Sequence, residues 1–278
     1  EQLSSSSSIE SGLYRDFVQQ QKALGLIYMP LNSYYEMGEW THNPENTNVY
    51  EKLFKEYESE YGYEYAVKFL RGGIWKNFFV KYYESNHIHK RIVELSLAKK
   101  GLKRKDYYLP LYKTQSNDVL WHGVFGGLYL PNLRNNTYRY IYECENMRYV
   151  GKGDVVEVRD LNFDGYDDIK LVNSNFIAHF DTKNGCMMSE LGLRDKLFNI
   201  QNTIKRIKEA YHLKIENNIL HPETINDNNG GISTIHGLNT ATLEEMKSDF
   251  VFDRFEKKSF IDHITDYSFS TESFKSDT

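Results

Sequence analysis

The stretch QSNDVLWHGVFGG, residues 115 to 127, concentrates side chains that could bind a polar ligand. Asn117 and Asp118 offer an amide and a carboxylate, and Trp121 and His122 follow within four residues. A carboxylate accepts hydrogen bonds from hydroxyl groups, and an indole presents a flat apolar face. A spacing of i, i+3 would place Asp118 and Trp121 on one side of a helix. The structural alternative is that Asn117 and Asp118 cap this helix while Trp121 packs in a core.

Three glycines close the same stretch: Gly123, Gly126 and Gly127. On a helix they would form a stripe without side chains, where a second helix can come close. Their spacing matches neither the Walker nor the dinucleotide-binding pattern, so we expect no phosphate loop here.

The segment DLNFDGYDD, residues 160 to 168, has the spacing of a calcium-binding loop. Gly165 would allow the tight turn, and a cation would relieve the repulsion among the aspartates. The alternative is an acidic β-turn without an ion. Ca²⁺ is the one cofactor that the sequence suggests, with no cluster of His and Cys for zinc and no organic cofactor. The oxygen ligands would be Asp160, Asn162, Asp164 and Asp168.

Composition narrows the class of protein. The chain has 278 residues, of which 26% are charged and 40% hydrophobic, as in a globular protein of two domains. The net charge of -5 argues against a nucleic-acid partner, and no apolar run is long enough to cross a membrane. The only cysteines, Cys144 and Cys186, are too few for a disulfide framework, so a cytoplasmic location is expected.

The aromatic content is high, with 22 Tyr, 16 Phe and 3 Trp. Aromatic faces stack on sugar rings and also on one another, so this composition suits either a carbohydrate site or a thick core. Trp75, in the block IWKNFF, shows the same ambiguity. It could be a platform for a sugar or a core residue beneath the helices.

Several elements must position these residues. Apolar spacing predicts helices over 44–62, 86–99 and 132–148, and a further helix that begins near Ser116 or Asn117. The apolar run LGLIYMP, ended by Pro30, predicts one buried strand of an α/β unit. After Gly151, short apolar runs between Asp, Asn and Gly turns predict antiparallel β structure, with hairpin turns at NSN and KNG.

Five blocks in this order resemble a known family: LIYMPLNSYYEMGEW, RGGIWKNFFVKYYESNHIHKR, QSNDVLWHGVFGGLYLPNLR, LNFDGYDDIKLVNSNFIAHF and ISTIHGLN. They are similar to the middle and C-terminal parts of the family-57 glycoside hydrolases, in the branch of the 4-α-glucanotransferases and α-amylases. The resemblance covers most of residues 24 to 265.

The resemblance implies an α+β fold with three parts: an incomplete (β/α) barrel, a helical segment at its mouth and a C-terminal β-sandwich. Residues 1–30 would be a remnant of the barrel edge, 31–150 the helical domain that lines the cleft, and 151–278 a partial sandwich. We therefore expect the chain to be a fragment of a longer protein.

The resemblance also implies a retaining mechanism on α-1,4-glucans, with two carboxyl groups roughly 5–5.5 Å apart. In the family both carboxyl groups lie upstream of the matched region, so no catalytic residue is assigned in this chain and the chain alone should be inactive. Asn117, Asp118 and Trp121 map onto positions that contact substrate. His122 would border the cleft or pack behind it.

The blocks leave some positions in doubt. The family often has Ala-Tyr where Val119 and Leu120 stand, and Pro where Tyr83 stands. Glu36, Glu39 and Trp40 could border the cleft or merely anchor a loop. A competing hypothesis is a carbohydrate-binding or structural module without catalysis. The sequence leaves open whether such an enzyme is a transferase or a hydrolase, and whether it forms a homo-oligomer.

Overall fold

The computed structural model describes residues 12–28, 33, 37–38, 40–102, 104–123, 126–220, 250–264 and 270–272. The chain divides into two compact units, Glu1–Asn32 and Ser33–Thr278. The first unit contains helix α1 (Tyr14–Gln20), which is followed by extended chain to residue 28. The strand predicted over 24–30 is wrong in its described part, 24–28. Leu24 and Leu26 are fully exposed and belong to no sheet.

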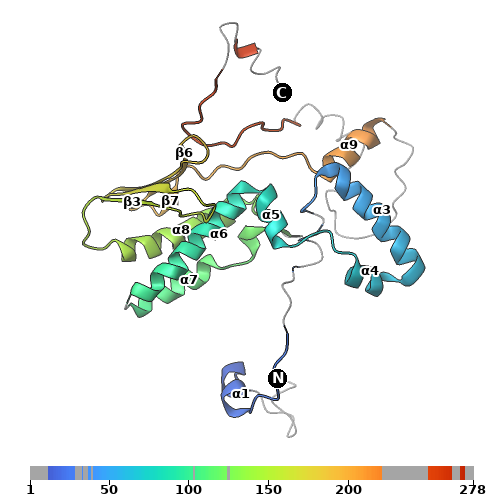
Figure 1. Ribbon diagram of the computed structural model, residues 1–278, viewed down its shortest axis with the longest axis horizontal. Coiled ribbons are helices and arrows are strands. Elements are labelled where there is room, and N and C mark those ends of the chain that lie inside the picture. The colour runs from blue at the N-terminus through green and yellow to red at the C-terminus, as the bar shows by residue number, and fades with distance from the viewer. Residues whose placement is uncertain are drawn as a thin grey trace. The chain divides into compact units, whose positions relative to one another are not determined.

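Helices dominate the first half of the second unit (Figure 1). Three of the predicted helices are confirmed, as α3, α6 and α8. The side chain of Asn43 accepts a hydrogen bond from the amide of Asn46 at 2.8 Å and so caps α3, while Pro131 occupies the first turn of α8. The helices are α3 (Pro44–Tyr61), α4 (Tyr63–Phe69), α5 (Trp75–Lys81), α6 (Tyr83–Ala98), α7 (Tyr108–Thr114), α8 (Pro131–Arg148) and α9 (Ala210–Leu220).

Burial agrees with the predicted helix faces for α6 but not for α3. Ile88, Ile92 and Leu95 of α6 are all buried, as their spacing predicts. On α3 the apolar residues with helical spacing are Val49, Leu53, Phe54, Tyr57 and Tyr61. Only Phe54 is buried, whereas Val49 remains more than half exposed. Periodicity predicted that α3 forms, but not that most of its apolar face stays uncovered in this chain.

The helix predicted to begin near Ser116 is wrong. Helix α7 ends at Thr114, and residues 118–120 form a single 3₁₀ turn. A short antiparallel hairpin follows, made of β1 (His122–Gly123) and β2 (Gly126–Gly127). The physical reason lies in the glycines, because Gly126 and Gly127 have φ of +99° and +135°, which helices do not allow. Gly126 and Gly127 therefore form the second strand of the hairpin rather than a stripe on a helix.

A five-stranded antiparallel sheet with the strand order β3-β4-β5-β6-β7 forms the second half of the unit. Both predicted hairpin turns are confirmed. Residues 173–175 join β4 to β5, and the turn at 183–185 joins β5 to β6, with Gly185 at a φ of +69°. The strands are β3 (Val155–Arg159), β4 (Asp168–Val172), β5 (Phe176–Asp181), β6 (Met187–Leu193) and β7 (Phe198–Asn199).

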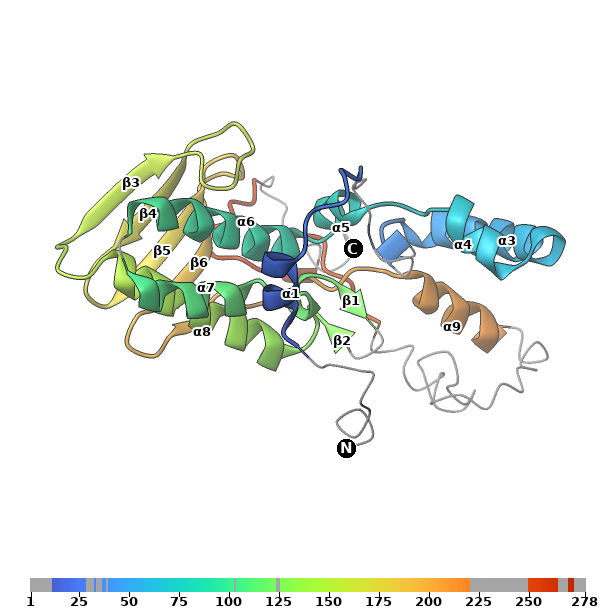
Figure 2. The same ribbon diagram turned by 90° about the horizontal axis from the view of Figure 1, so that it is seen from below.

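Helices α6 and α8 lie across one face of this sheet (Figures 1 and 2). A buried ionic network joins the layers. Arg91 of α6 pairs with Glu94 on the same helix, with Glu145 on α8 at 2.6 Å and with Glu190 on β6 at 3.0 Å. Lys170 of β4 reaches Glu145 at 2.5 Å. Because sheet and helices share one core, the α+β class is confirmed; the division into three domains remains a prediction.

The other face of the sheet is apolar. Strand register aligns Val156, Leu171, Ala178 and Leu191 in one row across four strands. Val156 is 67% exposed, while Phe180, in the next row, packs against Phe260 with ring centroids 6.4 Å apart. An apolar row of this kind is typical of a sheet that a second layer covers, as the predicted sandwich requires.

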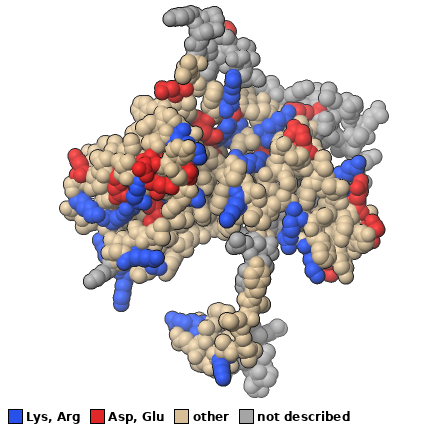
Figure 3. Space-filling view, in the orientation of Figure 1, with Lys and Arg blue, Asp and Glu red and all other residues tan. Residues whose placement is uncertain are grey.

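The surface carries charges of both signs. On the face shown in Figure 3, basic and acidic side chains are interspersed rather than separated into one-sign areas. Within the described residues, no helix combines the length and apolarity that crossing a membrane requires.

Candidate functional site

Two segments that lie far apart in sequence pack against each other beside the start of α5. Gly38 and Gly72 touch through their backbones, since a Cβ on Gly38 would lie 2.9 Å from the amide nitrogen of Gly72. Beside them, a Cβ on Gly73 would collide with the side chain of Thr41. The glycines therefore let the backbone at Gly38 and the side chain of Thr41 pack directly on Gly72 and Gly73. This contact brings Trp40 and the start of α5 into one neighbourhood.

His122 occupies the centre of this neighbourhood, enclosed by aromatic rings. Its imidazole stacks on Tyr129 with centroids 4.0 Å apart and an interplanar angle of 5°. Trp40, Phe78 and Tyr82 contact it edge-on at 5.2, 5.2 and 4.6 Å. The four rings come from the segment at 40, helix α5, its C-cap and the turn that follows β2. His122 therefore joins three of the blocks that the sequence analysis singled out.

Burial fixes the protonation state of this histidine. His122 is 3% exposed, and neither ring nitrogen has a hydrogen-bond partner. Burial, with the nearby ammonium group of Lys81, lowers the pKa of His122 to about 3. His122 is thus neutral at pH 7 and holds the aromatic rings in place. Its burial fits the second of the two roles considered for it, packing behind a cleft, and the cleft itself stays a prediction.

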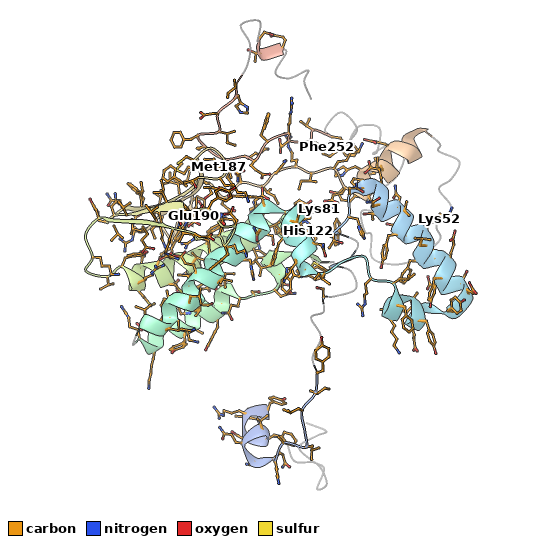
Figure 4. The ribbon with its side chains drawn as sticks, in the orientation of Figure 1. Lys52, Lys81, His122, Met187, Glu190 and Phe252 are labelled. Carbon is orange, nitrogen blue, oxygen red and sulfur yellow. The ribbon has the colours of Figure 1, made fainter. Side chains whose placement is uncertain are left out.

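The rings of Trp40, Phe78, Tyr82 and Tyr129 form an aromatic cage around His122. A polar cluster that the sequence did not predict lies next to this aromatic cage. Glu209 accepts hydrogen bonds from the hydroxyl of Tyr82 and from Nζ of Lys81, the latter at 2.7 Å. Burial raises the pKa of the Glu209 carboxyl and that of the Tyr82 hydroxyl. Figure 4 shows Lys81 and His122 on the same side of α5. Because 127 residues separate Tyr82 from Glu209, no local pattern could have indicated the contact.

Of the three tryptophans of the chain, Trp40 contacts His122 directly, Trp121 precedes His122 in the sequence, and Trp75 begins α5. Each packs on the core and remains half-buried, so that part of each indole faces outward. Such a surface suits stacking on the apolar face of a pyranose.

The other predicted ligands in this stretch lie at the surface. Asp118 is exposed and Asn117 is half-buried. The Oγ of Ser116 donates a hydrogen bond to Asp118 at 3.1 Å. No side-chain cap holds the 3₁₀ turn at 118–120, so the structural alternative of a capping Asp118 is not what the structure shows.

Trp75 begins α5, where its amide nitrogen donates to Oγ of Ser33 at 2.8 Å. Its indole packs against Phe79, with centroids 5.8 Å apart, and its Nε1 is buried without a hydrogen-bond partner. The ring is therefore part core and part surface, and its role as a sugar platform remains a prediction. Glu36 and Glu39, two further candidates for the cleft, lie outside the described residues.

The acidic segment at 160–168 forms a tight turn between β3 and β4. Asp160 accepts hydrogen bonds from the amides of Asp164 and Gly165, at 3.1 and 3.0 Å. Asp168 accepts from the amides of Leu161 and Asn162, at 3.1 and 3.2 Å. Among the described residues, Asp160, Asp164 and Asp168 do not converge as three carboxylate ligands. Calcium binding by Asp160, Asn162, Asp164 and Asp168 stays a prediction.

Comparison with known proteins identifies the parts of the chain. A model of the middle domain of the alpha-amylase/4-alpha-glucanotransferase group matches residues 73–148, and a model of the C-terminal domain matches residues 160–278. The first matched region ends before β3, and the second begins directly after it. The first covers the aromatic cage except for Trp40, and the second covers the acidic turn.

The individual relatives are also alpha-amylases and 4-alpha-glucanotransferases. An alpha-amylase of Pyrococcus furiosus is 31% identical over 99% of this chain and 40% of its own length. A 4-alpha-glucanotransferase of Thermococcus kodakarensis is 33% identical over 95% of this chain and 39% of its own. The crystal structure of the 4-alpha-glucanotransferase from Thermococcus litoralis aligns with a TM-score of 0.59 and 34% identity, over 76% of this chain and 32% of that one. The chain thus spans about two-fifths of the length of these curated relatives.

Proposed function

Because the chain belongs to the alpha-amylase/4-alpha-glucanotransferase family of glycoside hydrolases, we propose that it is the glucan-binding part of an enzyme that acts on α-1,4-linked glucans. Its residues bind and orient the sugar chain, while catalysis rests on two carboxyl groups outside this sequence. With one buried and one exposed free cysteine and no disulfide, the chain fits a cytoplasmic enzyme.

The observation that carries the proposal is that Trp40 packs edge-on against the buried His122, which lies in the same short stretch as the half-buried Trp121 and the exposed Asp118. The indoles provide flat apolar faces, and Asp118 provides an acceptor for sugar hydroxyls. The ring cage behind them is rigid, because His122 and Tyr129 stack and Trp40 packs on their edges. Preformed surfaces lose little entropy when a ligand binds.

In a retaining mechanism, one carboxylate attacks the anomeric carbon and one carboxylic acid protonates the departing oxygen. The contribution of this chain is to hold the sugar rings in register with those groups. Asp118 would fix hydroxyl groups, and Trp121 would fix the plane of a ring. Whether water or a second glucan then accepts the glycosyl group decides between hydrolysis and transfer.

Tryptophan fluorescence tests this function directly, because Trp40 and Trp121 belong to the proposed site and the sequence has only one other tryptophan, Trp75. Titration with maltoheptaose should change the emission of the wild-type chain in a saturable way, and cellohexaose should not. The variant Trp121→Ala should bind maltoheptaose more weakly, by roughly tenfold for the loss of about 1.4 kcal/mol. An emission spectrum that maltoheptaose leaves unchanged would contradict glucan binding at this site.

A further inference from the structure

A small polar cavity lies between α6 and the helix-facing side of the sheet, away from the aromatic cage. It has a volume of about 20 Å³, enough for one water molecule or one ion. Its polar lining includes His87 on α6, Asn162 before β4, Asp168 on β4, and His179 and Asp181 on β5. The proposed glucan site uses none of these residues.

Two buried carboxylates face each other in this cavity. The register of β4 and β5 pairs Ile169 with Phe180, which places Asp168 opposite Asp181 at the end of the ladder. Asp168 is 4% exposed and Asp181 is 3% exposed. Within the described part of the chain, neither carboxylate forms an ion pair with Lys or Arg. Two adjacent carboxylates removed from water are unfavourable unless a positive charge compensates them.

The basic residues of the lining do not supply that charge. Arg91 is already engaged by Glu94, Glu145 and Glu190. Lys90 lies with its ammonium group over the ring of Phe163, 5.5 Å from the centroid. Both carboxylates accept hydrogen bonds from neutral donors, Asp168 from backbone amides and Asp181 from Asn184 and Tyr83, but no cation of the lining neutralises their charge.

Two unpartnered atoms of the lining indicate the chemistry of a ligand. His179 is 3% exposed, and its Nε2 forms no hydrogen bond. Oδ1 of Asn162 is also buried without a partner, while Nδ2 of the same side chain reaches Asp168 only at 3.5 Å. A polar cavity surrounded by carboxylates and an amide oxygen matches the oxygen ligands that hard cations prefer.

A second group of buried ligands is less suitable. Glu94, Glu145 and His179 bring ligand atoms within 4.8 Å of one another. Lys170, however, already contacts Glu94 at 3.0 Å and Glu145 at 2.5 Å, and Arg91 contacts both. An added divalent cation would meet two positive charges there.

We propose that the cavity binds a divalent cation, with Ca²⁺ as the best match, through the carboxylates of Asp168 and Asp181 and Oδ1 of Asn162. His179 binds the ion through a water molecule. The ion would neutralise the facing carboxylates and fasten β4 and β5 to the turn before β4. This placement differs from the loop predicted from sequence, because it requires Asp181 and does not use Asp160.

Calorimetric titration of the chelator-treated chain with CaCl₂ tests the placement. The wild type should bind one ion, and Asp181→Asn should weaken binding by at least about tenfold, the loss typical of altered metal-site partners. Asp160→Asn is the matched control and should bind as the wild type does. No binding by the wild type would overturn the proposal, and so would loss of binding in Asp160→Asn with retention in Asp181→Asn.

Terbium luminescence gives a second readout that does not depend on removing a carboxylate. Tyr83 lines the cavity, whereas Tyr166 lies exposed in the acidic turn. If Tb³⁺ replaces Ca²⁺ in the cavity, Tyr83→Phe should remove most of the tyrosine-sensitised emission and Tyr166→Phe should remove little. The opposite result would place the ion in the turn.

Discussion

At the scale of single residues, His122 shows how burial decides the role of a side chain. The folded state keeps its imidazole neutral, with a pKa of about 3, whereas an unfolded chain has the ordinary value near 6.5. Between these values the unfolded state binds one more proton than the folded state. This part of the stability is complete above about pH 6.5 and is lost as the pH falls toward 3.

The variant His122→Phe should therefore reduce the pH dependence of stability. Phe fills a similar volume in the ring cage and removes two unpartnered nitrogens, so we expect little loss of stability at pH 7. The slope of unfolding free energy against pH between 4 and 6 should fall by roughly 1.4 kcal/mol per pH unit, the share of one proton. Urea unfolding at several pH values measures it, and an unchanged slope would mean that His122 titrates normally.

Asp118 should affect binding and not folding. If Asp118 binds glucan as proposed, Asp118→Ala in the full-length protein should remove hydrogen bonds from sugar hydroxyls to a charged group, worth about 1.5–3 kcal/mol. That corresponds to a loss of roughly ten- to a hundredfold in kcat/KM on maltooligosaccharides. The melting temperature should stay unchanged, because the side chain is exposed. Normal kinetics with a lowered melting temperature would show a structural role instead.

Several of these residues could be selected from sequence, and others could not. Trp121, His122 and Asp118 stand out because one short stretch contains all three. Glu209 and Tyr129 carry no local signal, since their importance arises from contacts across the fold.

At the scale of elements, the β1–β2 hairpin depends on a single glycine. Gly127 has a φ of +135°, and a Cβ there would overlap the carbonyl oxygen of Trp121. We expect Gly127→Ala to destabilise the chain by more than about 2 kcal/mol, because strained backbone and overlap combine. Gly62 is a suitable control. It also has a positive φ, of +88°, but open space around it, so Gly62→Ala should introduce backbone strain without overlap and cost less than Gly127→Ala.

Chemical denaturation of both variants measures this difference. Equal losses for Gly127→Ala and Gly62→Ala would show that the close approach to Trp121 is not needed for the fold.

The same hairpin explains why one element was predicted wrongly. Long periodic segments such as 44–61 and 131–148 reveal helices from sequence, because many residues report the same period. The stretch from 115 to 127 is too short for periodicity to distinguish a helix from a hairpin, and its glycines are compatible with both. Only the positive φ of Gly126 and Gly127 identifies them as part of a hairpin rather than a stripe on a helix.

At the scale of the whole molecule, buried charges connect the helical layer to the sheet. Arg91 joins carboxylates from α6, α8 and β6 that are up to 99 residues away in sequence. The sequence could not predict this network, because each of its members taken alone resembles an ordinary charged residue at the surface.

Arg91→Met should leave three buried carboxylates without their main partner and destabilise the second unit by about 3–5 kcal/mol. Lys52→Met is the control, since Lys52 forms only an exposed pair with Glu56 at 3.9 Å and should change stability by less than about 1 kcal/mol. Thermal melting compares the two. Similar melting temperatures for the two variants would show that the network does not hold the layers together.

The size distribution of maltoheptaose products tests the central claim most directly, namely that this chain binds glucan while catalysis rests on carboxyl groups outside it. The full-length enzyme should convert maltoheptaose into shorter or longer oligosaccharides, and the 278-residue chain alone should leave it unchanged. Redistribution of maltoheptaose by the chain alone would contradict the account, because the catalytic pair would then lie within these 278 residues.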